Sequence, residues 1–397
     1  MAPACVTRRR SKRARPNNGV LPTEMLFEIL LRLPTIKDLS RLRLVCRAWR
    51  DLLTSDPAFA RAHPSVRRLV AAGVCKLRGE IKFVDVLSGE VAKRMPVHEA
   101  RVRYGHNVTT QAGHVCVQAG SVGPCVVAAV ATGAATVLPA GVPVKHSAGD
   151  RIVSSTSLLG RAPSTGDYKV LRTHLCFGVV GPTSFYYHTC DVTTLGGARG
   201  DGRWRVRPDP PMRISGDFER RVVVNGIAYF LSDPYNCSTT DGSSRAIASF
   251  DMATEEWRPP MLPGPLSSLQ SSSGNEMIEV GNINGRDFML AEVNCFLVTV
   301  HFKHQHLTDL WFLVDVDKGL WTKRYSVETT TLESRRFDKS LPLVILDDGR
   351  IVFWKQQENA LRVYDPETRG WADVATVKDY FCIGMFKGSL LCSGIQG

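Results

Sequence analysis

The chain has 397 residues, of which 44% are hydrophobic and 22% are charged, and its formal net charge is +12. This length is too great for one compact core, so we expect two or more domains, and the composition is that of an ordinary soluble globular protein. The eleven cysteines show no paired Cys-x-x-Cys spacing, which argues against a zinc ribbon and against a disulfide-stapled secreted domain.

Residues 1–20 are predicted to form a basic disordered tail without an acidic residue. The segment lacks the apolar core of a signal peptide, so we expect the protein in the nucleus, the cytoplasm or both. Its basic cluster fits a nuclear-import signal or a plain solvated tail equally well, and a nucleic-acid-binding arm is the less favoured interpretation. The cluster consists of Arg8, Arg9, Arg10, Lys12, Arg13 and Arg15.

Residues 21–62 follow as a helical module. Thr23 is a candidate N-cap and Pro34 ends the first helix, and a longer second helix is expected over roughly 40–53 before Asp56 and Pro57 close the module. The first helix has one apolar face and a second apolar strip. The face holds Leu26, Ile29, Leu30 and Leu33, and the strip holds Phe27 and Leu31.

A module of about forty residues cannot bury this much apolar surface by itself. The second apolar strip therefore contacts either another protein or the rest of this chain, and the spacing is compatible with both alternatives.

From about residue 66 to residue 397 the pattern becomes all-β. A loose repeat recurs there, in which a strand ends in aspartate, a short polar turn follows, and a tryptophan often comes next. The repeated aspartates are Asp85, Asp191, Asp251, Asp315 and Asp365, with Ala129 at the same place in a degenerate copy. The tryptophans at a constant distance from the aspartate are Trp257, Trp321 and Trp371.

This repeat predicts a β-propeller of roughly six blades rather than an irregular β-sandwich, which is the alternative. The aspartate is expected in the turn between two strands of a blade, and the tryptophan between neighbouring blades. Residues 125–144 are apolar, but their glycines and prolines favour two buried strands joined by a turn over a membrane helix.

Other chemistry-bearing residues give weaker patterns. His301, His304 and His306 lack neighbouring acidic or cysteine ligands, so a polar strand or loop is favoured over a metal site. The sequence contains no nucleophile elbow, phosphate loop or His-Glu-x-x-His helix. We therefore expect no enzyme activity, no metal and no cofactor.

The helical module resembles an F-box. That family has two Leu-Pro pairs around a Leu-x-x-Ile-Leu helix and then a Val-Cys-basic-x-Trp helix. Here these are Leu21-Pro22, Leu26 with Ile29-Leu30, Leu33-Pro34, and Val45-Cys46-Arg47-Ala48-Trp49. The β region resembles the F-box-associated, kelch-like domains of plant F-box proteins, so the implied architecture is α+β and multidomain: a small three-helix F-box and a kelch-like propeller.

The resemblance implies a non-catalytic substrate receptor of a Skp–cullin–F-box ubiquitin ligase. Its partners would be a Skp-type adaptor, cullin and RING subunits through that adaptor, and an unknown protein substrate, with no membrane; a nuclear nucleic-acid or chromatin binder is the alternative. Some of the implied adaptor-binding residues must instead form the core of the module. They are Leu21, Pro22, Leu26, Ile29, Leu30, Leu33, Pro34, Leu44, Val45, Cys46 and Trp49.

Overall fold

The computed structural model divides into two compact units, Met1–Arg67 and Arg68–Gly397. The basic tail predicted over 1–20 lies outside the described residues. In the described part of the chain, no helix is long and apolar enough to cross a membrane. The described residues are 21–33, 39, 42, 45–62, 69–75, 80–96, 106–139, 150–180, 182–196, 202–233, 246–265, 287–303, 307–328, 340–377 and 380–386.

The described residues of the N-terminal unit form short helices. These are α1 (Thr23–Leu31), α3 (Arg47–Ser55) and α4 (Pro57–Ala62). Leu39 and Leu42 are also helical, so the expected count of three helices stays a prediction. Helix α4 contacts both α1 and α3, so it packs the last helix of the unit against the first.

Three local details differ from the sequence expectation. Pro22, not Thr23, is the N-cap of α1, because the first helical hydrogen bond runs from the Leu26 N–H to the Pro22 carbonyl oxygen at 3.0 Å. The helix expected over 40–53 is interrupted at Cys46, whose backbone is extended at φ −158° and ψ 174°. Valine and cysteine have low helix propensity, which accounts for a break at this point.

Asp56 does not close the module but starts a further helix. Its Oδ1 atom accepts hydrogen bonds from the backbone N–H groups of Ala58 at 2.7 Å and Phe59 at 3.2 Å. Pro57 takes the first helical position, where its missing N–H costs nothing. An N-cap aspartate followed by proline is a helix start, and α4 follows from it.

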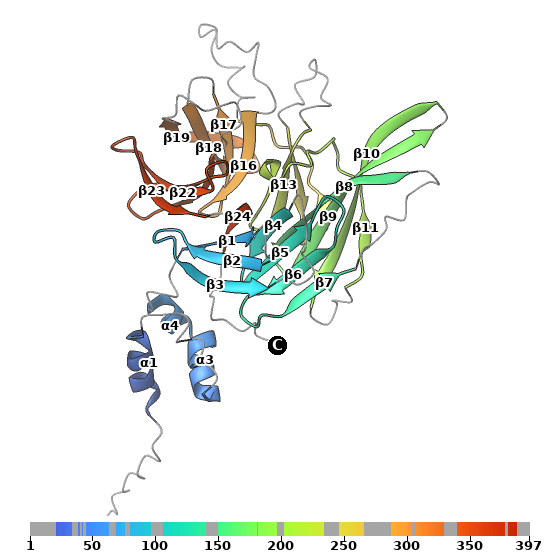
Figure 1. Ribbon diagram of the computed structural model, residues 1–397. Helices are drawn as coiled ribbons and strands as arrows, with labels where there is room; N and C mark the ends of the chain where they lie inside the picture. Colours follow the sequence, from blue (N-terminus) through green and yellow to red (C-terminus); the bar gives the residue numbers. More distant parts are fainter. Residues whose placement is uncertain are drawn as a thin grey trace, which may run out of the picture. The chain divides into compact units, whose positions relative to one another are not determined.

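The second unit is a six-bladed β-propeller in which each blade is a four-stranded antiparallel sheet, as counted over the described residues (Figure 1). The bounds by blade, inner strand first, are as follows. Blade 1 has β24 (Tyr380–Phe386), β1 (Val70–Cys75), β2 (Glu80–Asp85) and β3 (Val91–Pro96). Blade 2 has β4 (His106–Gln111), β5 (His114–Ala119), β6 (Cys125–Ala129) and β7 (Ala135–Leu138). Blade 3 has β8 (Arg151–Arg161), β9 (Tyr168–Val180), β10 (Thr183–Leu195) and β11 (Arg205–Arg207).

The remaining blades follow the same order, and a short 3₁₀ helix, η1 (Phe218–Arg220), precedes blade 4. Blade 4 has β12 (Arg221–Val224), β13 (Ile227–Leu231), β14 (Ile247–Asp251) and β15 (Glu256–Trp257). Blade 5 has β16 (Phe288–Val293), β17 (Phe296–Phe302), β18 (Leu307–Asp315) and β19 (Leu320–Glu328). Blade 6 has β20 (Ser340–Ile345), β21 (Ile351–Lys355), β22 (Ala360–Asp365) and β23 (Gly370–Thr376).

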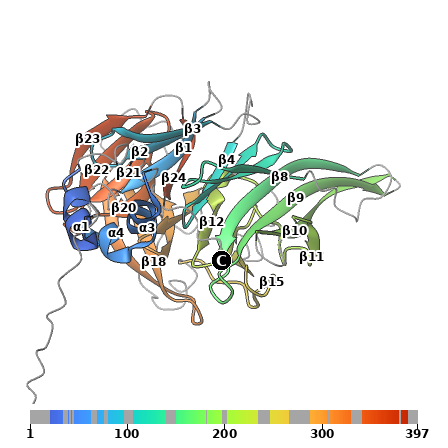
Figure 2. The ribbon, with the colours of Figure 1, turned by 90° about the horizontal axis from the view of Figure 1, so that it is seen from below.

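The two ends of the propeller close the ring in blade 1. Strand β24 pairs antiparallel with β1, with Val70 opposite Phe386 and Gly73 opposite Ile383. The inner strands of all blades then surround a common axis, and the blades fan out around it (Figure 2). The expected number of blades is confirmed, while the kelch-like subtype stays a prediction.

The hydrophobic core lies between blades. One cluster joins Leu171 and Val192 of blade 3 to Phe230 and Phe250 of blade 4. Equivalent clusters join blades 2 and 3, blades 4 and 5, and blades 5 and 6. Each blade is therefore stabilised by its neighbours, because one sheet cannot bury both of its faces alone.

The aspartate and tryptophan positions follow the repeat with one exception. The Oδ1 atoms of Asp85, Asp251, Asp315 and Asp365 accept backbone N–H bonds in the turn between the third and fourth strands of their blades. Asp191 was expected in such a turn but lies within β10, where it is 3% exposed and faces Arg172. The expectation fails there because the β9–β10 ladder continues past Asp191 as far as Leu195.

Residues 125–144 contain two paired strands, β6 and β7, joined by a turn. Strand β6 is buried, but Ala135, Thr136 and Val137 of β7 are exposed, so only half of the expectation of two buried strands is correct. Strand β7 is the outer edge of its blade, where one face and one edge are open to solvent.

The two rims of the propeller differ in the length of their connections. On one rim the strands are joined by tight turns, such as 112–113, 225–226, 294–295 and 316–319. On the other rim the connections run over 139–150, 208–220, 232–246, 258–287 and 329–339. We call this second edge the long-connection rim, since loops that vary in length commonly carry recognition.

Candidate partner-binding surfaces

The F-box-like unit has a small core of its own. Leu26 and Leu30 of α1 are 4% and 0% exposed, and Phe59 of α4 is fully buried. The rings of Phe27 and Phe59 meet edge to face, with their centroids 5.5 Å apart. Leu26 and Leu30 thus pack inside the unit as part of the predicted apolar face. Phe27 was expected in the second strip, which contacts another protein or the rest of the chain, but it also packs inside the unit, on Phe59.

A different strip of α1 remains exposed. Met25 and Ile29 lie four residues apart on one side of the helix and are 55% and 43% exposed, and Leu21, just before the N-cap, is 45% exposed. Val45, which precedes α3, is 60% exposed. Exposed large apolar side chains at regular helical spacing form a surface suited to another protein.

The predicted adaptor-binding residues therefore separate into groups. Ile29 was placed on the same face as Leu26 and Leu30, but only the latter two are buried. Met25 was missed, although its spacing from Leu21 and Ile29 is visible in the sequence. Leu21, Pro22, Ile29, Val45 and Cys46 are exposed, Leu33 and Trp49 are half-buried, Leu26 and Leu30 are buried, and Pro34 and Leu44 lie outside the described residues.

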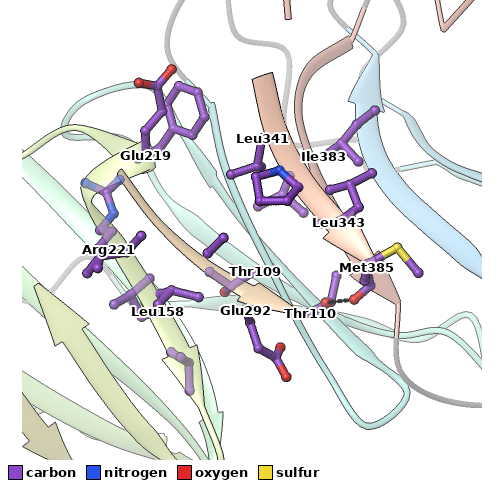
Figure 3. A pocket seen from close by; sticks show the side chains of 18 residues that line it. Thr109, Thr110, Leu158, Glu219, Arg221, Glu292, Leu341, Leu343, Ile383 and Met385 are labelled. Carbon is purple, nitrogen blue, oxygen red and sulfur yellow. Dashed lines mark hydrogen bonds between the residues drawn. The ribbon is translucent and has the colours of Figure 1, made fainter. Parts of the chain in front are cut away.

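The propeller axis contains a cavity of about 110 Å³, which is lined by the inner strands of all six blades and by η1. Glu219 and Arg221 lie on one side, and Leu341, Leu343 and Ile383 lie on the other (Figure 3). Sites for drug-sized ligands usually measure ~300–1,000 Å³. The cavity therefore suits a few water molecules, and the outer surface is the better place to bind a protein.

A buried polar cluster lies on the face of blade 3 that packs on blade 2. Ser155 Oγ lies 2.7 Å from His174 Nδ1, and His174 Nε2 lies 3.6 Å from Asp191 Oδ2. Arg172 donates two hydrogen bonds to Asp191, at 3.0 and 2.7 Å, and its guanidinium group lies 3.7 Å from the centroid of the Trp204 ring. Serine, histidine and aspartate also occur together in hydrolases, but this histidine is 2% exposed and its aspartate is already paired with arginine. The cluster is structural.

The segment 202–211 joins aromatic and basic residues, a pattern that fits a solvated loop between blades or, less commonly, a contact for an acidic partner. In the structure Arg205 and Arg207 are already bound to Glu255, which also pairs with Lys169 at 2.9 Å. Burial raises the pKa of Glu255, but hydrogen bonds and charge from Arg205 and Lys169 outweigh burial and lower the pKa to about 2. This cluster joins blades 3 and 4.

The histidine-rich segment does not supply a metal site within the described residues, which hold no group of three or more potential ligands. His301 is 5% exposed and stacks on Phe288, with ring centroids 4.5 Å apart. His304 and His306 lie outside the described residues.

Comparisons with known proteins match both units. Residues 19–63 match the F-box-like family, and residues 87–376 match the F-box associated beta propeller domain. An Arabidopsis thaliana protein that is named as an F-box protein is 51% identical over 43 residues, which are 11% of this chain and 11% of that protein.

Solved structures are similar only at low identity. A chain of a nidogen/laminin complex has a TM-score of 0.43 and 11% identity, with 82% of this chain and 99% of that chain covered. Virginiamycin B lyase from Staphylococcus aureus has a TM-score of 0.38 and 10% identity, with 75% and 78% covered. The match to the propeller family spans most of the chain. The chain therefore belongs to the F-box proteins that carry an F-box associated β-propeller domain.

Proposed function

We propose that the protein is the substrate-recognition subunit of a Skp–cullin–F-box ubiquitin ligase. In this function the F-box-like unit binds a Skp-type adaptor and, through it, the cullin and RING subunits, while the propeller binds the protein to be ubiquitinated. The observation that supports adaptor binding is the exposed strip of Leu21, Met25 and Ile29 with Val45, beside a core that uses other leucines.

The receptor contributes proximity rather than chemistry. By holding a target beside a ubiquitin-charged enzyme, it raises the effective concentration of the target's lysines. The family match and the buried, arginine-paired state of Asp191 support a non-catalytic subunit.

Adaptor binding is tested by co-expression of the full-length protein with a Skp-type adaptor. Met25→Asp with Ile29→Asp places charges on the exposed strip and should abolish co-purification, while the melting temperature stays near that of the wild type. Thr23→Asp is a control, because it adds one negative charge to α1 on another side of the helix and suits its N-terminus.

Retained adaptor binding in the double variant would contradict this placement of the interface. Aspartate at Leu26 and Leu30 would be a poor test, because both side chains are buried and the unit itself would unfold.

We also propose that the basic cluster in residues 1–20 is a nuclear-import signal, based on its composition. A fluorescent fusion of the full chain should accumulate in the nucleus and should lose this enrichment when Arg8, Arg9 and Arg10 are replaced by alanine. An unchanged distribution would contradict the proposal.

A further inference from the structure

Blade 3 has an extension on the long-connection rim. Strands β9 and β10 are 13 residues each, and they run out past the other blades together with the start of β8 (Figures 1 and 2). Strand β11 covers only Cys190–Val192 of β10, so the outer half of the hairpin projects from the blade. We define the blade-3 extension as residues 151–153, 176–180 and 182–187.

One face of the extension carries a row of aromatic and basic residues. Phe177 and Tyr186 are opposite each other in the β9–β10 ladder, and their ring centroids are 5.2 Å apart. Arg151 is the partner of Phe177 on β8, and its guanidinium group lies 4.9 Å from the centroid of the Phe177 ring. At the other end Arg213 donates a hydrogen bond of 3.0 Å to the Tyr186 carbonyl oxygen.

This row is more accessible than most aromatic pairs of the propeller, with Phe177 half-buried and the other members exposed. Tyr186 is 42% exposed and Val179, on the same face nearer the tip, is 51% exposed. Arg151 and Arg213 are exposed as well. The row therefore presents two apolar rings between two positive charges.

Side-chain contacts on the opposite face stabilise the conformation of the hairpin. The Phe185 and Tyr187 rings lie 5.7 Å apart, and the Tyr187 hydroxyl donates to Asp150 Oδ2 at 2.8 Å. A Cβ atom at Gly178 would lie 3.0 Å from Phe185 and 3.2 Å from Tyr187, so glycine leaves the room that these rings occupy. A rigid support lowers the entropy cost when a partner binds the exposed rings.

The charges indicate the chemistry of the partner. Rigid aromatic side chains next to arginine are the usual anchors of protein interfaces, and arginine pairs with carboxylates. A partner that adds a strand to the β10 edge fits less well, because Arg213 already occupies the Tyr186 carbonyl oxygen there.

We propose that the blade-3 extension binds an acidic segment of the target protein, in which carboxylates flank an aromatic or aliphatic side chain. The apolar side chain would pack on Phe177 and Tyr186, and the carboxylates would pair with Arg151 and Arg213. This proposal rests on the proposed function of the protein as a substrate receptor.

The experiment uses the full-length protein co-expressed with a Skp-type adaptor and two fluorescein-labelled peptides. One peptide has a Leu-Phe pair flanked by glutamates, and the other has lysines in place of the glutamates. Fluorescence anisotropy should show binding of the acidic peptide only, weakened by added salt. Tyr186→Ala should weaken binding by about fivefold or more.

Charge reversal provides the decisive variant. Arg151→Glu with Arg213→Glu should abolish binding of the acidic peptide and create binding of the lysine peptide. Both side chains are exposed, so these substitutions should leave the melting temperature nearly unchanged.

Two matched controls should bind the acidic peptide like the wild type. Val180→Ala removes an apolar side chain that is 66% exposed, but on the opposite face of the same hairpin. Arg324→Glu removes an arginine that lies 5.0 Å from the ring centroid of Phe296, which is 40% exposed, in blade 5.

The proposal is overturned if the acidic peptide does not bind, if both peptides bind equally, or if Val180→Ala weakens binding as much as Tyr186→Ala does. Adaptor co-purification separates this outcome from a failure of the proposed function. An intact adaptor complex without peptide binding rejects the docking surface alone, and a wild-type protein that binds no adaptor rejects the receptor function itself.

Discussion

At the scale of single residues, the repeated aspartates have the same sequence pattern but two different roles, and Asp191 is the one that differs. Four repeated aspartates accept backbone N–H bonds in exposed or half-buried turns, which is the local chemistry that the repeat predicts. Asp191 instead neutralises the buried guanidinium group of Arg172 between blades 2 and 3. The contribution of Asp191 to stability therefore depends on Arg172, on the neighbouring strand β9, and not on hydrogen bonds within a turn.

Asp191→Ala should lower the free energy of unfolding by about 3–5 kcal/mol, because it leaves the Arg172 charge buried without its carboxylate. Asp365→Ala, at an exposed turn, is the control and should cause a clearly smaller loss. Denaturant titration followed by circular dichroism measures both variants. Equal losses would show that Asp191 acts only as another turn residue.

Glu255 should make the propeller sensitive to acid. Its pKa of about 2 in the folded state lies below its usual 4.5, so its contribution to stability is complete above pH 4.5 and is lost as the pH falls from 4.5 towards 2. The difference in unfolding free energy between the wild type and Glu255→Gln should therefore shrink over this pH range. If the difference in unfolding free energy between the two proteins stays constant from pH 4.5 to pH 2, the lowered pKa of Glu255 is contradicted.

At the scale of elements, a tryptophan near or on the outer strand links each of four blades to the preceding one. The indole N–H groups of Trp204, Trp257 and Trp321 donate to the carbonyl oxygens of Pro139, Pro208 and Pro263 at 2.7–2.9 Å. Trp371 does the same with Glu328 at 2.8 Å. The predicted packing of tryptophan between blades is confirmed, and a hydrogen bond to the neighbouring backbone accompanies it.

Trp321→Phe should cost about 1 kcal/mol of stability through the lost hydrogen bond, beyond any loss from the smaller ring. Trp311→Phe is the matched control. Among the residues that the structure describes, no acceptor lies within hydrogen-bond distance of the Trp311 indole N–H. Urea unfolding of the two variants gives the difference, and a larger loss for Trp311→Phe would contradict this explanation.

At the scale of the whole molecule, the last strand completes the first blade. Strand β24 supplies the inner strand of blade 1 and buries Ile383 and Phe386, each 6% exposed. The ring is thus closed by hydrogen bonds between residues that lie at opposite ends of the propeller sequence. Without β24, strand β1 would lose its hydrogen-bonded partner, and β4 and β20 of the two neighbouring blades would lose the strand that packs between them.

Truncation after Val377 should therefore prevent formation of a soluble folded propeller. The loss of two buried side chains alone costs about 2–5 kcal/mol each, against a usual total stability of 5–15 kcal/mol. Truncation after Phe386 is the control and should retain the fold. Size-exclusion chromatography and limited proteolysis distinguish the two, and a stable monomer from the shorter chain would refute the role of β24.

Much of the architecture was predictable because its signals are local. Turn aspartates and the tryptophans that follow them recur along the chain, and four-stranded blades follow from their spacing. The candidate adaptor surface was predictable only in part. Leu26, Ile29 and Leu30 of α1 are all large and apolar, so the sequence does not distinguish them. Leu26 and Leu30 are buried and Ile29 is exposed because of where α4 packs.

The sequence by itself determined the order of the units, the F-box pattern and the repeating blades, since these depend on residues within a few positions of one another. Only the tertiary structure decided which strand closes the ring, which aspartate pairs with Arg172, and how Arg151, Phe177, Tyr186 and Arg213 form one row. Those features join residues that are distant in the chain, and their contacts exist only after the strands have found their register.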